Sequence, residues 1–188
     1  MKLFTTGAIA IAVLASASFV VAEEVQSGLQ AGKLVGPFYV TKVAGAEEDG
    51  VKNGNNLCYR CKNGGRPQVM VFTRSTDEKV VKLVKELDAA ITKNSSKQLR
   101  AFVNCLGDAK STAEKEAKTL AANSKAKSVP FVAPNEVENG PADYGINPKA
   151  EVTVILAEGG KVKANHAFAS GNDVNVDAVI ADLAKILN

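Results

Sequence analysis

The chain has 188 residues, of which 46% are hydrophobic and 23% are charged, and its formal net charge is +3. This length suits one domain that is large enough to bury a real core. The lysines are spread along the chain, which is typical of solvated helix faces and not of a nucleic-acid-binding surface. We therefore expect no nucleic-acid partner.

Residues 1–22 have the pattern of a secretory signal. Lys2 supplies the charged start, residues 7–21 are apolar, and small or apolar residues precede a cleavage site after Ala22. As a helix this apolar stretch is about 22 Å long, short of the ~30 Å core of a bilayer. No later segment is apolar enough to span a membrane. The sequence therefore predicts an exported protein, periplasmic or secreted, without membrane attachment after cleavage.

The first half of the mature chain alternates between loops and strands. Residues 23–35 are weakly patterned and are interpreted as a loose lead-in to a domain that fills residues 36–188. Residues 37–44 alternate like a strand. Residues 46–66 are rich in glycine, asparagine and charge, which predicts a long loop of the kind that is often functional. Residues 68–73 are almost all apolar, which favours a buried parallel strand.

Two capping boxes predict where the next helices begin. Ser75 with Glu78 opens a helix that has an apolar stripe, and Ser111 with Glu114 opens an Ala- and Lys-rich helix. A strand at residues 99–106 lies between them. The apolar stripe of the first helix consists of Val80, Leu83, Val84, Leu87 and Ile91.

The C-terminal part reads as a short extended segment at residues 129–133, a loop at 135–150, and a hairpin of strands at 152–157 and 161–168. A last helix with one apolar face covers residues 176–186. Two right-handed crossovers followed by a hairpin predict an α/β fold. Its mixed central sheet has helices on both faces and an N-terminal strand extension.

Three stretches carry a resemblance to a known family: GPFYV at residues 36–40, PQVMVF at 67–72 and YGINPKAEVTVILAEGGKV at 144–162. They resemble the redoxin branch of the thioredoxin-fold superfamily, which includes peroxiredoxins and periplasmic thiol–disulfide proteins. The resemblance covers roughly residues 36–187 and implies a thioredoxin-like fold. The chain is also similar to uncharacterised secreted proteins of planctomycete bacteria.

The chain departs from this family at two positions of the ordinary active site. The family places a reactive cysteine after the first core strand, but residues 73–77 read Thr-Arg-Ser-Thr-Asp. The family also places a cis-proline before its fourth strand, where this chain has Ala150 and Glu151. We therefore do not expect an ordinary thioredoxin or peroxidase mechanism, and the sequence leaves open whether the chain is an enzyme.

The chain instead has a C-x-x-C motif inside the loop at residues 46–66. In a redox role, Cys58 is the attacking thiolate, Arg60 and Lys62 stabilise it by their positive charge, and Cys61 resolves the mixed disulfide. The partners would then be proteins that bear thiols or disulfides. In a structural role, a disulfide between the two cysteines pins the loop of a non-catalytic binding or envelope protein. Both roles remain open from the sequence.

The remaining candidate side chains are Cys105 and His166. Zinc requires four ligands as a rule, and the only soft candidates are these two residues with Cys58 and Cys61. We expect Cys105 roughly 20 Å from the C-x-x-C, because it lies at the end of a strand whose six-residue parallel neighbour starts just after the motif. We interpret Cys105 as a buried inert thiol and His166 as a partly buried, hydrogen-bonded side chain.

The C-Y-R-C-K sequence is also similar to the lysine variant of the haem c attachment motif. A single motif of this kind in a compact α/β domain is weak support for haem. We expect no cofactor and no metal, and the sequence does not predict the oligomeric state.

Overall fold

A computed structural model describes residues 25–188, so the predicted signal at residues 1–22 lies outside the described residues. Within residues 25–188, no helix is long and apolar enough to cross a membrane. The strands are β1 (Val40–Ala44), β2 (Asn56–Leu57), β3 (Gln68–Thr73), β4 (Arg100–Cys105), β5 (Phe131–Pro134), β6 (Val152–Glu158) and β7 (Lys161–Phe168). The α-helices are α1 (Tyr59–Asn63), α2 (Glu78–Lys93), α3 (Lys110–Ser124), α4 (Val176–Ala181) and α5 (Ala184–Leu187). The 3-10 turns are η1 (Glu47–Asp49), η2 (Ser95–Lys97), η3 (Ala142–Tyr144) and η4 (Gly171–Asp173).

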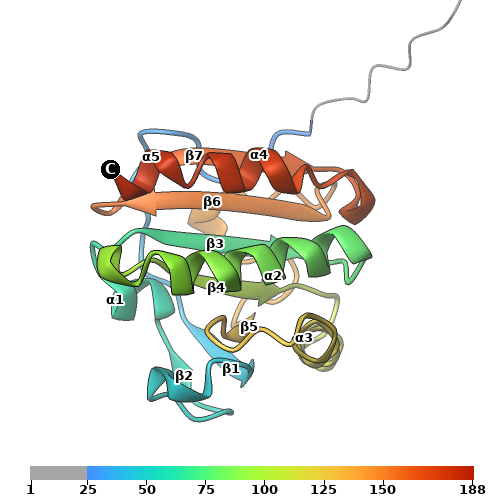
Figure 1. The fold of residues 1–188 in the computed structure, drawn as a ribbon. Coiled ribbons are helices and arrows are strands. Elements are labelled where there is room, and N and C mark those ends of the chain that lie inside the picture. Colours follow the sequence, from blue (N-terminus) through green and yellow to red (C-terminus); the bar gives the residue numbers. More distant parts are fainter. Residues whose placement is uncertain (1–24) are drawn as a thin grey trace, which may run out of the picture.

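The strands form one seven-stranded sheet in the order β2-β1-β5-β4-β3-β6-β7 (Figure 1). β3 is parallel to β4, and β4 is parallel to β5. β6 is antiparallel to β3 and to β7, and β1 is antiparallel to β5 and to β2. The sheet is therefore mixed, as the sequence predicted, and the apolar run at β3 is buried along its whole length.

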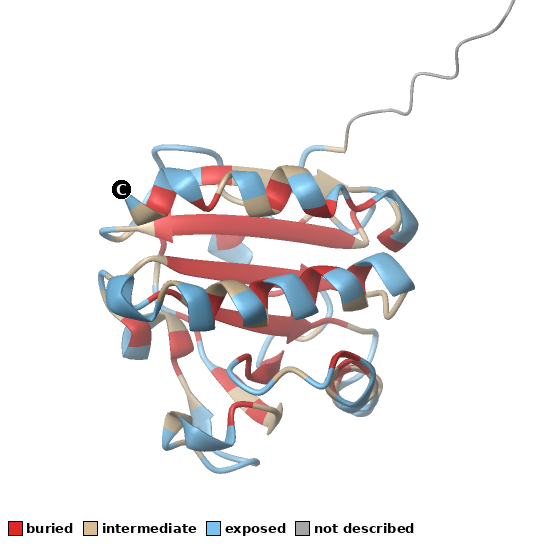
Figure 2. Ribbon diagram, viewed as in Figure 1, coloured by how far each residue is buried: buried red, intermediate tan, exposed pale blue. Residues whose placement is uncertain are grey.

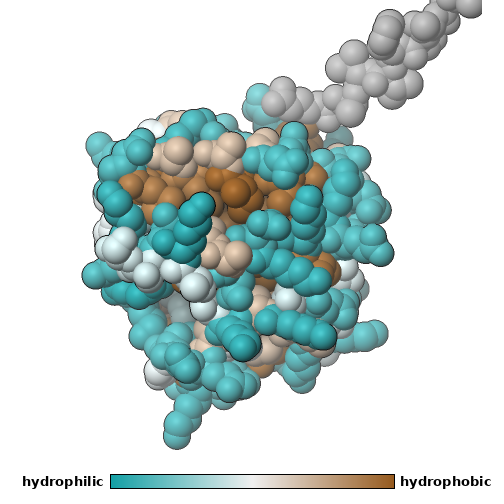
Figure 3. Space-filling model, in the orientation of Figure 1, coloured by the Kyte–Doolittle hydropathy of each residue, from teal (hydrophilic) through white to brown (hydrophobic). Residues whose placement is uncertain are grey.

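Two apolar clusters cover the two faces of the sheet, and β3 contributes alternate residues to both. Figure 2 shows β3 buried along its length. Val69 and Val71 pack with apolar residues of α2, α3, α4 and α5. Met70 and Phe72 pack on the other face with Tyr59 of α1 and Tyr144 of η3. In the view of Figure 3 the surface is largely hydrophilic, with an apolar band where α2 meets the terminal helices. Helices thus cover both faces, as predicted.

Both capping-box predictions are wrong. α2 begins at Glu78, and the Ser75 hydroxyl accepts a hydrogen bond from the backbone N–H of Asp77 at 3.1 Å. This bond closes a local turn after β3 in place of a helix cap. α3 begins at Lys110, so Ser111 lies inside its first turn.

The predicted lead-in and loop are more ordered than expected. Ser27 is buried, and its hydroxyl lies 2.6 Å from that of Thr153 in β6, so the segment from residue 25 packs along the sheet. The segment at residues 46–66 contains η1, β2 and α1. β1 is shorter than predicted because Phe38 leaves the sheet to pack edge-on against Tyr144, at 4.9 Å between ring centroids.

Candidate functional site

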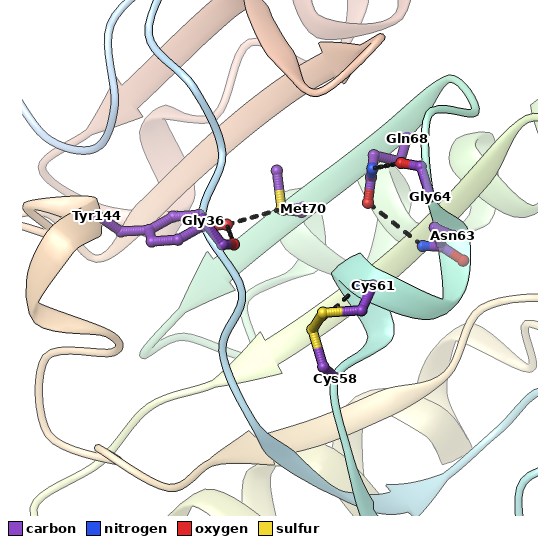
Figure 4. The surroundings of a disulfide bond; sticks show 8 residues. All are labelled: Gly36, Cys58, Cys61, Asn63, Gly64, Gln68, Met70 and Tyr144. Atoms are coloured by element: carbon purple, nitrogen blue, oxygen red, sulfur yellow. Dashed lines mark hydrogen bonds between the residues drawn. A yellow bond between two sulfur atoms is a disulfide. The ribbon is translucent and has the colours of Figure 1, made fainter.

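The two cysteines of the C-x-x-C motif form a disulfide on α1 (Figure 4). Cys58 lies immediately before the helix, and its Sγ accepts a hydrogen bond from the backbone N–H of Cys61 at 3.0 Å. The motif thus lies on a helix and not in the predicted loop, because a five-residue helix is too short to show a helical period in the sequence. Cys105 is the free cysteine of the described chain.

The two cysteines of the disulfide differ in their exposure to solvent. Cys58 is buried, with 9% of its surface exposed, whereas Cys61 is exposed. Figure 4 shows the disulfide and the Asn63–Gln68 contact on different sides of the short helix. Of the two cysteines, Cys61 is therefore the more accessible to solvent.

Contacts other than the disulfide hold α1 against the sheet. Tyr59 is 3% exposed and its ring stacks on that of Phe102, with 5.8 Å between centroids. At the other end of the helix, Asn63 Nδ2 donates to Gln68 Oε1 at 3.5 Å, and Gln68 Nε2 donates to the carbonyl of Gly64 at 3.2 Å. None of these contacts involves a sulfur atom of the disulfide.

A buried ion pair anchors the same helix from β1. Lys42 is 1% exposed, and its Nζ donates at 2.8 Å to the Asp49 carboxylate and to the carbonyls of Ala46 and Val51. The Tyr59 hydroxyl donates to the other carboxylate oxygen of Asp49. Burial raises the pKa of Tyr59 well above its usual value, and the hydrogen bond to Asp49 raises it further. The burial of Lys42 could not be predicted from the sequence, because a lysine on an alternating strand is typical of a solvated position.

The two basic residues proposed to assist Cys58 are placed differently. Arg60 is half-buried, and its Nη2 would lie 3.2 Å from a Cβ added at Gly160, so it extends toward the β6–β7 turn. Its Nε is buried and has no hydrogen-bond partner in the described part of the chain. Lys62 is exposed and belongs to none of the ion pairs formed by residues 25–188.

A cavity of about 960 Å³ lies beside α1, between the helix and the η1 segment. Neither Cys58 nor Cys61 is among its lining residues. Four basic and four acidic residues line it, namely Lys62, Arg66, Arg100, Lys127, Glu47, Glu48, Asp49 and Asp88.

Comparisons with known proteins identify the fold. No protein-family model matches the chain, and no curated protein is significantly similar to it. A proposed thiol:disulfide interchange protein DsbE from Chlorobium tepidum superposes with a TM-score of 0.60 at 16% identity, covering 85% of this chain and 99% of that protein. Mycobacterium tuberculosis AhpC superposes with a TM-score of 0.58 at 13% identity, with the same coverage. A proposed protein disulfide isomerase from Bacteroides thetaiotaomicron gives 0.58 at 11% identity, covering 86% and 92%.

The chain has a thioredoxin-like fold. At these identities the likeness is one of fold alone, so the function is argued from the residues. In this fold the disulfide of Cys58 and Cys61 precedes β3, the strand whose far end leads into α2.

Structural hydrogen bonds occupy the junction between β3 and α2. The Arg74 backbone N–H donates to the Glu151 carbonyl at 2.8 Å, and Arg74 Nη2 donates to Asn139 Oδ1 at 2.8 Å. The Glu151 carboxylate accepts from the backbone N–H of Gly171 at 2.7 Å. No cysteine lies at this junction, and these groups bind one another, whereas Arg74 Nη1 is buried without a hydrogen-bond partner among residues 25–188.

Cys105 is the last residue of β4 and lies beside the end of β3 that is farther from the disulfide. It is fully buried and pairs in register with Thr73, and burial raises the pKa of its thiol strongly. Within residues 25–188, no group of three or more His, Cys, Asp or Glu side chains is arranged to hold a metal ion. Cys105 is therefore a poor nucleophile.

His166 is a partly buried, hydrogen-bonded side chain, as predicted. Its side chain is 19% exposed, and Nε2 lies 3.0 Å from Oδ2 of Asp182. Asp182 also pairs with Lys185, whose Nζ lies 2.9 Å from Oδ1. The hydrogen bond from Lys185 lowers the pKa of Asp182 most, and the charges of Lys185 and His166 lower it further.

The Asp182→Asn variant is expected to lower stability at pH 7 and to have no effect in acid. A carboxyl whose pKa is lower in the folded state stabilises the protein above its unfolded pKa of about 3.9. This contribution disappears as the pH falls through the lower folded value. For such an exposed pair we expect less than about 1 kcal/mol. Thermal unfolding across pH 2–7 measures it, with Asp177→Asn in the first turn of α4, the helix that ends just before Asp182, as the control. A difference that persists at the acid end would contradict the ion-pair account.

Proposed function

We propose that this protein is an exported thiol–disulfide exchange protein that acts through the Cys58–Cys61 disulfide. The observation that carries the proposal is a disulfide with one exposed cysteine on a helix that other contacts anchor. An exchange protein must remain folded in both redox states, and the Tyr59 and Asn63 contacts of α1 do not involve the sulfur atoms. The signal pattern at residues 1–22 supports export to a compartment where disulfides persist.

The partners we propose are proteins that bear thiols or disulfides. Cys61 is exposed and neither cysteine lines the cavity beside α1, which suits a macromolecular partner better than a small molecule. Lys62, which follows the exposed cysteine, is free to attract carboxylates of such a partner.

The alternative is a binding or envelope protein in which the disulfide is structural. Closing a ring of four residues adds only on the order of 2 kcal/mol to the free energy of unfolding in the chain-entropy model. Because Tyr59 and Lys42 already fix the segment, little is left for the disulfide to hold. This alternative is tested by the same experiment as the proposal.

The reduction potential of the pair distinguishes the two functions. We expect a value above about −300 mV, since structural disulfides typically lie below that. The measurement is equilibration in dithiothreitol buffers followed by thiol alkylation and mass spectrometry, in a Cys105→Ser background that leaves one redox pair. The reduced protein should remain folded, with a free energy of unfolding lower by about 2 kcal/mol. A potential below −300 mV, or unfolding on reduction, would show that the disulfide is structural.

The mass of exported protein tests cleavage before Glu23.

A further inference from the structure

We infer that Cys61 is the sulfur that exchanges with the partner and that Cys58 is the internal leaving group. The inference rests on the proposed function and reverses the order that the sequence suggested, in which Cys58 attacks first. Two independent observations carry it: the unequal exposure of the cysteines and the hydrogen bond to Cys58 Sγ.

The first observation concerns access. A thiolate that attacks a disulfide must approach the sulfur it bonds to, so the rate depends on which sulfur is accessible. Cys61 is exposed, whereas Cys58 is 9% exposed and lies beside Tyr59, which is embedded in the apolar cluster of this face. A protein partner therefore reaches Cys61 more readily than Cys58, because Cys61 is the exposed residue of the pair.

The second observation concerns the leaving group. When the S–S bond breaks by attack at Cys61, the electron pair remains on Cys58. The backbone N–H of Cys61 already points at Cys58 Sγ, at 3.0 Å. A hydrogen bond to the charged form stabilises it, and a better stabilised thiolate leaves faster. The same N–H belongs to Cys61 itself, so it offers the Cys61 sulfur no equivalent bond.

The proposed thiol–disulfide exchange takes place in two steps. A partner thiolate attacks Cys61 Sγ, forming the mixed disulfide and expelling the Cys58 thiolate, which takes up a proton. A second thiolate of the partner then attacks the partner sulfur of the mixed disulfide and expels the Cys61 thiolate, which is also protonated. The partner dithiol loses two electrons and two protons and becomes a disulfide, while the Cys58–Cys61 pair gains them. In the opposite direction, Cys61 attacks a partner disulfide and Cys58 resolves the adduct.

Two single-cysteine proteins test the inference in the Cys105→Ser background. Cys58→Ser leaves the thiol of Cys61, and the serine hydroxyl preserves a helix-capping group. Cys61→Ser leaves the thiol of Cys58 and keeps the backbone N–H that it accepts from. We expect Cys58→Ser to form a mixed disulfide with glutathione disulfide at least about tenfold faster than Cys61→Ser, because only Cys61 is accessible. Urea unfolding of both proteins checks that they are folded.

A second measurement uses the pair intact. Oxidised protein is treated with excess glutathione, quenched with acid and digested with trypsin, which cleaves after Arg60 and so separates the two cysteines. The glutathione adduct should be found on Cys61. Equal rates, faster reaction of Cys61→Ser, or an adduct on Cys58 would overturn the assignment. A reduction potential above −300 mV would still support the proposed function in that case, so the two failures are distinguishable.

Discussion

Replacing Lys42 with methionine is expected to lower the free energy of unfolding by about 3–5 kcal/mol, the range for removing one partner of a buried ion pair. Lys42 is 1% exposed and its ammonium donates to Asp49 and to two backbone carbonyls. Methionine retains most of the volume, so the change removes charge and donors and leaves the packing largely intact. The Asp49 carboxylate then keeps only the Tyr59 hydroxyl and the Val51 N–H as donors.

Urea denaturation measures this loss, and Lys110→Met is the matched control. Lys110 is 62% exposed and lies 3.9 Å from Glu114 in an i,i+4 pair, so its replacement should cost less than about 0.5 kcal/mol. A loss below about 1 kcal/mol for Lys42→Met would contradict a structural role for the pair. Because Asp49 also binds Tyr59, the variant should loosen α1, and hydrogen exchange of the α1 amides measures that.

Gly45→Ala is the second change for which we expect a large effect, about 2–4 kcal/mol of lost stability. Gly45 has φ +74°, where an L-residue is strained, and an added Cβ would lie 2.4 Å from the carbonyl oxygen of Val129 and 2.8 Å from Cδ2 of Phe131. The first of these atoms belongs to the backbone just before β5, which pairs with β1. Neither the chain at Gly45 nor the backbone at Val129 can move apart without disturbing the pairing of β1 with β5.

Gly50→Ala separates the cost of backbone strain from the cost of the close contact that a Cβ at Gly45 would make. Gly50 has φ +76°, almost the same conformation, but a Cβ there would meet no atom within 4 Å. It should therefore show only the backbone strain, about 1 kcal/mol. The difference between the two variants in thermal or urea unfolding gives the cost of the contact. Equal losses would show that the chain at Gly45 relaxes away from Val129.

The strands that the sequence predicted well are those whose pattern is long and whose environment is uniform. Gln68–Thr73 and Lys161–Phe168 have the predicted bounds, because a fully buried apolar run and a regular alternation each identify a strand. Ser75 was misread because a serine after a strand can cap a helix or close a local turn with the same hydroxyl. The choice between these two depends on Thr73, whose hydroxyl accepts from the Ser75 N–H at 3.0 Å.

The sequence by itself determined that Cys58 and Cys61 are close enough to form a disulfide. It also determined that no cysteine stands after β3, where the redoxin family that the chain resembles has its reactive cysteine. These conclusions depend on spacing and residue type, which the chain carries locally. Only the tertiary structure decided that Cys61 is exposed and Cys58 is buried. Exposure depends on how Tyr59 packs against Phe102 and binds Asp49, contacts between residues far apart in the chain that no local pattern records.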